Sequence, residues 1–259
     1  MGSLQQLDLL SSTAASADAV IHTAFGHAGV YEDAVQMDRA AINAMTDALA
    51  GSHKVFIMSS GTGFLGNTGP IPVSEEYPFD PDAPSRARCH NERAAIDAAG
   101  HGVRSVVFRL PQYVWGHGGS FFIPHQMDTA RKLRTAYYIL PGDQMTSGTH
   151  VDDVARAYLL ALKHAPAGSV YHISTSSNTS IRGIAEAVGA NLGVPAEGIT
   201  LEKALADQVW PDWMAHMWSY NNRVRADKAE RELQWTDFSR IDMLDDIRSG
   251  SYKPKNVTQ

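Results

Sequence analysis

Three short apolar segments that alternate with helical patterns are the feature that most limits how this chain can fold. The segments cover residues 19–24, 54–59 and 105–110, and each is a run of the kind that forms buried strands. Helical patterns cover residues 4–16, 32–50 and 91–99. Strands that alternate with helices and are apolar on both sides are typical of a parallel sheet covered on both faces. We therefore predict an α/β fold with a parallel sheet that helices cover on both faces.

The second half of the chain is less regular. Helical patterns recur at residues 152–163 and 181–192, with a strand pattern at 168–173 between them. Four of the five tryptophans lie within residues 201–240, where they either face a substrate or fill a small core. We predict a single domain over residues 1–259. Its sheet-forming core is expected at residues 1–115 with 148–175, and a small substrate-binding lobe at residues 116–147 and 176–252.

Charge and composition exclude several classes of protein. Lysine and arginine total 22 against 28 aspartates and glutamates, a formal net charge of −6, which disfavours a general binder of nucleic acid or of anionic membranes. No apolar run approaches the roughly 20 residues that span a bilayer, and the N-terminus lacks the pattern of a signal peptide. The single cysteine, Cys89, excludes a disulfide framework. We expect a cytoplasmic protein whose partner is a small-molecule substrate.

Residues 61–66 read Gly-Thr-Gly-Phe-Leu-Gly and follow a predicted strand, as the dinucleotide-binding motif does. That motif also needs a helix to begin inside it, because the pyrophosphate binds at the helix N-terminus. The next residues, 67–73, contain glycine and two prolines and cannot begin a helix. We interpret residues 61–66 as a glycine-rich loop at a strand end, which is still where open α/β sheets bind ligands.

Six ordered segments, spread over almost the whole chain, carry a family resemblance. They are residues 19–24 (a "VIHLAA" strand), 56–60 (a strand ending in "SS"), 109–111 with 114–116 ("RP…VYG"), 149–155 ("HVDDVA"), 170–173 (a late strand) and 233–235 ("LGW"). In this order they resemble the extended, atypical short-chain dehydrogenases/reductases of the NAD-dependent epimerase/dehydratase type. The resemblance implies a Rossmann-like fold, NAD or NADP as cofactor, and a small carbonyl or hydroxyl metabolite as substrate.

Three departures from the family pattern bear on function. The family begins with a glycine-rich βαβ unit, and the resemblance here starts after it, about 50 residues into the pattern. The family's Tyr-x-x-x-Lys pair falls on Pro84 and Arg88, and proline has no acid–base chemistry. The loop hydroxyl of the family falls on Gly61, although Ser60 and Thr62 flank it and could substitute.

The candidate catalytic residues are Ser60, Thr62, Arg88 and His90. Ser60 and Thr62 either orient a substrate carbonyl or satisfy loop backbone groups. Arg88 either holds an anionic group or is a solvated residue at a helix start. His90 has a side chain suited to proton transfer, with a surface histidine as the alternative. Tyr77 is a further candidate, as a replacement for the missing phenol.

The resemblance also places residues around the cofactor and the substrate. It implies cofactor contacts for Ala24, Phe25, Ser59, Arg88 and Pro111. A pocket wall after the third strand suggests substrate contacts, which we assign to Tyr113, Trp115, His117 and Trp213. We predict no metal site, because the spacing of His117, His125 and His150 matches no established ligand pattern.

Three functions remain open from the sequence. The first is an NAD(P)-dependent oxidoreductase or epimerase. The second is a cofactor-independent isomerase, lyase or cyclase, which the loss of the glycine loop, tyrosine and lysine favours. The third is a non-catalytic binding module.

The missing βαβ unit would leave the strand at residues 19–24 at the edge of the sheet, with unpaired backbone groups. We expect residues 1–16 to fold over this edge, a second copy to cover it in a homodimer, or the chain to be unstable.

Overall fold

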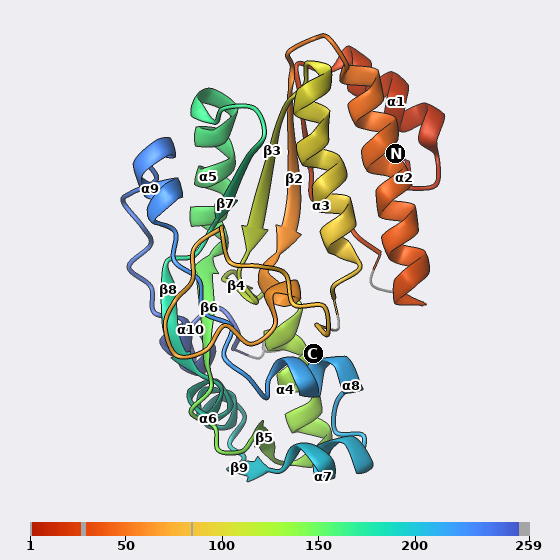
Figure 1. Cartoon of the computed structure of the whole chain (residues 1–259). Helices are drawn as coiled ribbons and strands as arrows, with labels where there is room; N and C mark the ends of the chain where they lie inside the picture. The colour runs from red at the N-terminus through yellow and green to blue at the C-terminus, as the bar shows by residue number, and fades with distance from the viewer. Residues whose placement is uncertain (1, 27–29, 84, 254–259) are drawn as a thin grey trace, which may run out of the picture.

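A parallel sheet with helices on both faces forms the upper part of the molecule, and a smaller lobe lies below it (Figure 1). The structure is a computed structural model that describes residues 2–26, 30–83 and 85–253. The sheet has four strands in the order β1-β2-β3-β7, all parallel. The predicted α/β class with a Rossmann-like sheet is confirmed.

For the strands that the sequence predicted, both ends lie within one or two residues of the predicted bounds. Their bounds are β1 Ala19–His22, β2 Val55–Gly61, β3 Arg104–Leu110, β4 Tyr113–Trp115, β5 Ala136–Ile139, β6 Met145–His150, β7 Ser169–His172, β8 Ser176–Ser180 and β9 Ala196–Ile199.

The predicted helices are also present, and the lobe adds several short ones. Their bounds are α1 Leu7–Ser16, α2 Tyr31–Leu49, α3 Arg88–Asp97, α4 Phe122–Leu133, α5 Val151–His164, α6 Ile181–Leu192, α7 Leu201–Ala206, α8 Asp212–Met217, α9 Asp227–Leu233 and α10 Met243–Ser249. Two 3-10 turns, η1 Thr62–Leu65 and η2 Ala98–His101, complete the elements.

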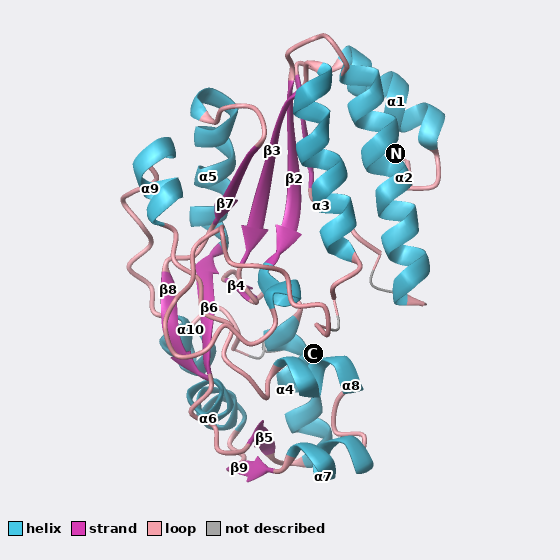
Figure 2. Ribbon diagram, in the orientation of Figure 1, coloured by secondary structure: helices cyan, strands magenta, loops and turns pink. Residues whose placement is uncertain are grey.

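Alternate residues of the central strands face opposite layers, as the two-residue period of a strand requires. Phe56 and Met58 of β2 face the core of α2 and α3, and Val55 and Ile57 face the core of α5 and α9. Figure 2 shows these two helical layers on either side of the magenta sheet. Both sides of the strands are therefore buried, which explains their unbroken apolar runs.

The lobe has its own core, formed around α4, α6 and α8. Two small sheets support it, with strand orders β4-β6-β8 and β5-β9. Trp210 and Trp218 fill this core, so for these two rings the packing alternative applies. Helix α9 and Trp235 instead pack on the face of the main sheet, although they lie inside the range assigned to the lobe. The division into core and lobe otherwise stays a prediction.

Strand β1 is an edge of the main sheet, because the described residues place no strand on its outer side. Helix α1 packs on α2 and borders an apolar groove that runs along β1. The side chain of Ile21 in this groove is 39% exposed. Residues 2–16 thus flank the edge without pairing with it, and the homodimer stays a prediction. In the part of the chain that the structure describes, no helix has the length and apolarity to cross a membrane.

A buried ion pair joins the end of β3 to α3. The guanidinium of Arg109 lies 2.5 Å from the carboxylate of Glu92, and both side chains are almost fully buried. Arg109 also donates to the carbonyl of Glu75 at 2.9 Å, and its guanidinium lies over the rings of Phe64 and Phe79. The Glu75 carboxylate in turn accepts from the backbone N–H of His172 at the end of β7.

We expect Arg109→Met to lower the free energy of unfolding by about 3–5 kcal/mol, because it leaves the Glu92 carboxylate buried and uncompensated. Urea unfolding measures the loss. The matched control is Arg131→Met, which breaks the exposed Arg131–Asp128 pair and should cost at most about 1 kcal/mol. Equal losses in the two variants would show that the buried pair does not hold this region.

His172 makes stability depend on pH. Burial, reinforced by the charge of Arg109, lowers the pKa of His172 to about 3. Below the unfolded pKa of about 6.5, the unfolded chain binds a proton that the folded chain excludes, so stability falls as the pH drops from there toward 3.

We expect His172 to lower the free energy of unfolding by up to about 1.4 kcal/mol for each pH unit below pH 6.5. His172→Asn should remove this contribution, measured as the slope of unfolding free energy between pH 7 and pH 4.5. The exposed His216→Asn should keep the parent slope. A parent-like slope in His172→Asn would contradict the assignment.

Candidate active site

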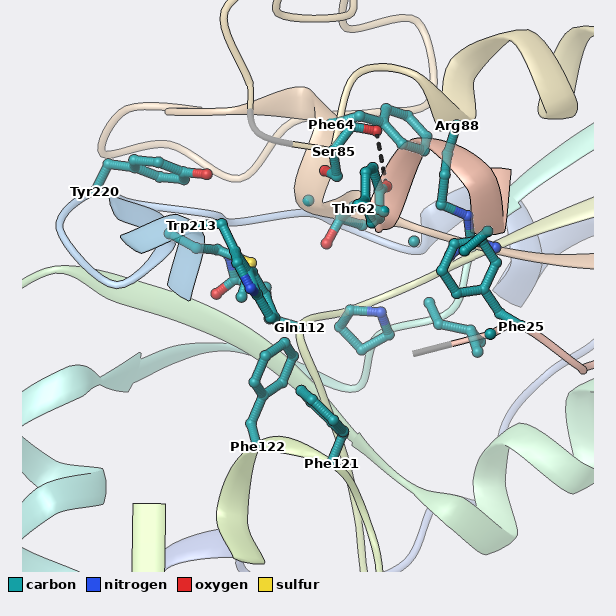
Figure 3. A pocket seen from close by; sticks show the side chains of 18 residues that line it. Phe25, Thr62, Phe64, Ser85, Arg88, Gln112, Phe121, Phe122, Trp213 and Tyr220 are labelled. Carbon is teal, nitrogen blue, oxygen red and sulfur yellow. Dashed lines mark hydrogen bonds between the residues drawn. The ribbon is translucent and has the colours of Figure 1, made fainter. Parts of the chain in front are cut away.

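A cavity of about 370 Å³ lies at the carboxyl ends of β1, β2 and β3 (Figure 3). Phe25 and Gly26 follow β1, Gly61 and Thr62 lie at the end of β2, and residues 110–112 lie at the end of β3. Carboxyl ends of parallel strands are where open α/β sheets bind ligands. The topology thus places this cavity where a ligand site is expected.

The opposite wall of the cavity comes from the lobe and is aromatic. Phe121 and Phe122 lie at the start of α4, Trp213 and Met217 belong to α8, and Tyr220 follows α8. The rings of Phe121 and Trp213 are nearly parallel, with an angle of 21° and centroids 6.3 Å apart. Each of these two side chains is 42% exposed. Apart from Trp213, our sequence analysis did not identify this wall, although the Phe-Phe pair after a glycine-rich turn was a usable signal.

Arg88 and Tyr31 form the polar end of the cavity. The Arg88 guanidinium lies 4.2 Å over the Phe25 ring and donates to the carbonyl of Ser59 at 3.0 Å. Its Nε is buried and has no hydrogen-bond partner among the described residues. The Tyr31 hydroxyl donates to the carbonyl of Ser85 at 3.4 Å, and burial raises the pKa of Tyr31 to about 12. Tyr31 thus brings to the cavity a phenol that stays protonated at neutral pH, which our sequence analysis missed.

Thr62 lines the cavity, but its hydroxyl is engaged within the protein. It donates to Oδ1 of Asn222 at 2.6 Å, and Nδ2 of Asn222 donates to the carbonyls of Thr62 and Gly66. This supports the backbone-satisfying alternative for Thr62. Ser60 is buried beside it, and its hydroxyl has no partner among the described residues, but Ser60 is not a lining residue.

Other predicted catalytic residues lie away from the cavity. His90 is exposed on α3, and Tyr77 donates to the carbonyl of Asn67 at 3.2 Å. Neither lines the cavity, and a catalytic role for either stays a prediction. Pro84, at the family's tyrosine position, lies outside the described residues.

Of the predicted cofactor contacts, Phe25, Arg88 and Pro111 line the cavity. Ala24 instead borders the groove along β1. The Ser59 hydroxyl lies 2.6 Å from that of Tyr158, on the side of the sheet that α5 covers. The structure therefore brings together three of the five.

Of the predicted substrate contacts, Trp213 alone lines the cavity. Tyr113 and Trp115 are buried in the lobe core. His117 is exposed and its Nε2 lies 3.0 Å from Asp152, at the start of α5. For these three residues the structure contradicts a place in the cavity wall.

His117 lies beside His150 and Asp152, whereas His125 does not belong to this group. His150 is the N-cap of α5, and its Nδ1 accepts the backbone N–H of Asp152. That nitrogen therefore already bonds to the end of the helix. His117, His125 and His150 do not come together as one group of ligands. The absence of a metal site stays a prediction.

The glycine-rich segment 61–66 forms the 3-10 turn η1 and no α-helix. Gly66 has φ +63°, and a Cβ at this position would collide with the carboxylate of Asp80. Gly66 therefore permits close packing of the loop, and does not leave space for a phosphate.

The sequence profile of the NAD dependent epimerase/dehydratase family matches residues 2–174. The chain belongs to this family. A protein of Schizosaccharomyces pombe without assigned function is 28% identical over 253 residues, which are 97% of this chain and 83% of the relative. The 4-hydroxy-2-methyl-3-oxo-4-farnesyl-3,4-dihydroquinoline-1-oxide ketoreductase of Stigmatella aurantiaca is 26% identical over 206 residues, 76% of this chain and 60% of the relative.

Solved structures of the family's fold superpose on the chain. The dTDP-glucose 4,6-dehydratase of Bacillus anthracis, in complex with NAD, has a TM-score of 0.74 at 16% identity and covers 96% of this chain and 77% of its own. The UDP-glucose 4-epimerase of Thermotoga maritima, with UDP-glucose, has a TM-score of 0.76 at 17% identity and covers 97% and 82%. These likenesses show the fold, and the family profile confirms the family resemblance seen in the sequence.

The dinucleotide that the family name implies needs a cradle of backbone N–H groups for its diphosphate. The glycine-rich segment 61–66 leads from β2 into a 3-10 turn and not into an α-helix, and Asp80 occupies the space beside Gly66. Arg88 is the single cation among the described residues that line the cavity. These residues therefore do not form a complete dinucleotide site.

We expect Gly66→Ala to destabilise the fold more than Gly69→Ala. Both glycines have positive φ, and Gly66, with ψ −140°, lies outside the left-handed helical region that alanine enters at a cost of about 1–2 kcal/mol. A Cβ at Gly69 meets nothing within 4 Å, whereas one at Gly66 also collides with Asp80. Thermal unfolding of the two variants measures the difference. Equal losses would mean that Asp80 does not require a glycine at this position.

Proposed function

We propose that this chain is an enzyme that binds a small carbonyl or hydroxyl compound in the cavity and exchanges a proton with its oxygen. The observation that carries the proposal is the pairing of a protonated phenol and a cation at one end of the cavity, at the carboxyl ends of the central strands. Membership of a family of epimerases and dehydratases supports it. The ketoreductase named above also acts, by its name, on a keto compound.

Tyr31 is the proton donor in this proposal. Its pKa of about 12 keeps the hydroxyl protonated, so it can donate to a carbonyl oxygen as negative charge develops there. The positive charge of Arg88 acts on Tyr31 in the opposite direction to burial and favours the phenolate. The same charge would stabilise an oxyanion on the substrate. Tyr31 would thus take the role of the tyrosine in the family's Tyr-x-x-x-Lys pair, and Arg88 would supply the positive charge of the lysine.

NAD or NADP is the first candidate for a cofactor, on the strength of the family and of solved relatives in complex with NAD. A cofactor-independent isomerase, lyase or cyclase is the second candidate. The lack of a diphosphate cradle among the described residues favours this second reading. Both candidates use the same cavity and the same proton donor.

Thermal unfolding with NAD(H) and NADP(H) separates the two candidates. A ligand at 100 times its dissociation constant adds about 2.7 kcal/mol of stability. For a chain of this size that corresponds to a rise in Tm of roughly 5–10 °C. If the chain is nicotinamide-dependent, one of the cofactors should produce this rise.

The control is Arg88→Met, which should reduce such a rise because it removes the cation from the cavity. A cooperative transition that no cofactor shifts would reject nicotinamide binding and leave the cofactor-independent enzyme. A chain without any cooperative transition would contradict both candidates for the chain as it stands.

A further inference from the structure

We propose that the ligand of this cavity is an uncharged, ring-containing compound with a hydrogen-bond acceptor, and not a nucleoside diphosphate sugar. This inference rests on the proposed function in taking the cavity as the substrate site. It is carried by the charge, the aromatic wall and two unpartnered donors of the described lining residues.

The charge of the cavity does not suit a diphosphate. Among the described lining residues there is one cation, Arg88, and no lysine, histidine or carboxylate. Phe25 covers the Arg88 guanidinium, which already donates to a backbone carbonyl. A buried diphosphate needs several charge-assisted hydrogen bonds to offset the loss of its hydration. The described residues do not supply them.

The aromatic wall suits a planar ring. Phe121 and Trp213 present nearly parallel faces at the cavity, and Phe122 and Tyr220 add further rings beside them (Figure 3). Aromatic rings favour offset or edge-to-face contacts with another ring over contacts with water. A volume of about 370 Å³ lies at the small end of ligand cavities, which span about 300–1,000 Å³. The wall therefore favours a compound of a few rings.

Besides Nε of Arg88, two buried donors of the lining residues lack a partner in the described part of the chain: Nε2 of Gln112 and the hydroxyl of Tyr220. Both residues line the cavity. Thr146 holds Oε1 of Gln112 at 2.8 Å, which fixes the amide. Burial raises the pKa of Tyr220 to about 12, so its hydroxyl remains a donor at neutral pH. Unpartnered buried donors are costly, and a carbonyl oxygen of the ligand would satisfy them.

Equilibrium dialysis with 2-acetylnaphthalene, 2-ethylnaphthalene and UDP-glucose tests the inference. The first probe has two rings and a ketone, the second lacks the ketone, and the third carries the diphosphate. We expect 2-acetylnaphthalene to bind saturably and about tenfold more tightly than 2-ethylnaphthalene, since its ketone oxygen accepts hydrogen bonds that the ethyl group cannot accept. UDP-glucose should not bind at the same concentrations.

Gln112→Met and Tyr220→Phe should each weaken 2-acetylnaphthalene binding and leave 2-ethylnaphthalene binding unchanged. The matched control is Gln126→Met, a buried glutamine on α4 that does not line the cavity, which should bind both naphthalenes as the parent does. Near-UV circular dichroism confirms that each variant is folded, and Tyr220→Phe serves if Gln112→Met does not fold.

Binding of UDP-glucose without binding of the ketone would overturn the inference, as would parent-like ketone binding by both folded variants. The assay measures binding alone, so its outcome is separate from that of the proposed function. A chain that binds the ketone and catalyses no reaction would refute the proposed function and keep the ligand class. A chain that catalyses a reaction of UDP-glucose would refute the ligand class and keep the proposed function.

Discussion

The buried Arg109–Glu92 pair is the interaction on which the arrangement of the site depends. It ties the end of β3 to α3, the helix that begins with Arg88. Through Glu75 the same network reaches the long loop after β2 and the end of β7. A buried guanidinium needs all of its partners, so these segments are held in one geometry. The residues on both sides of the cavity's polar end are thereby fixed in relation to the sheet.

The cavity combines two chemically different halves. The main sheet supplies the polar end, with Arg88 and the strand ends, and α2 supplies Tyr31. The lobe supplies the apolar wall, from α4, α8 and Tyr220. In the proposed function, proton transfer belongs to the half built on the sheet and α2. In the further inference, the lobe wall contributes to selection of the ligand.

The main sheet and its helices were predictable because each central strand is buried on both faces and therefore appears as an apolar run. The place of the site followed from the same topology, and the family resemblance identified Phe25, Thr62, Arg88 and Pro111. Tyr113 and Trp115 were predicted wrongly as cavity residues because both lie on the face of β4 that packs into the lobe core. Their two-residue spacing indicates that they share a face, but it does not say whether that face meets the core or the cavity.

The residues that were missed come together only through tertiary structure. Tyr31 and Tyr220 are separated by most of the chain, and no local pattern links them. Gln112 is distinctive because its amide is buried with a donor unpaired, which is a property of packing. Such features depend on how the lobe meets the sheet, and short-range sequence patterns carry little information about that contact.

Hydrogen exchange measured by mass spectrometry, with and without 2-acetylnaphthalene, tests most directly the claim that this cavity is the ligand site. We predict slower exchange in segments that line the cavity, at residues 61–65, 110–112 and 213–220. The groove along β1, at residues 19–23, should exchange at an unchanged rate. Protection confined to the β1 groove, or none at saturating ligand, would contradict the account.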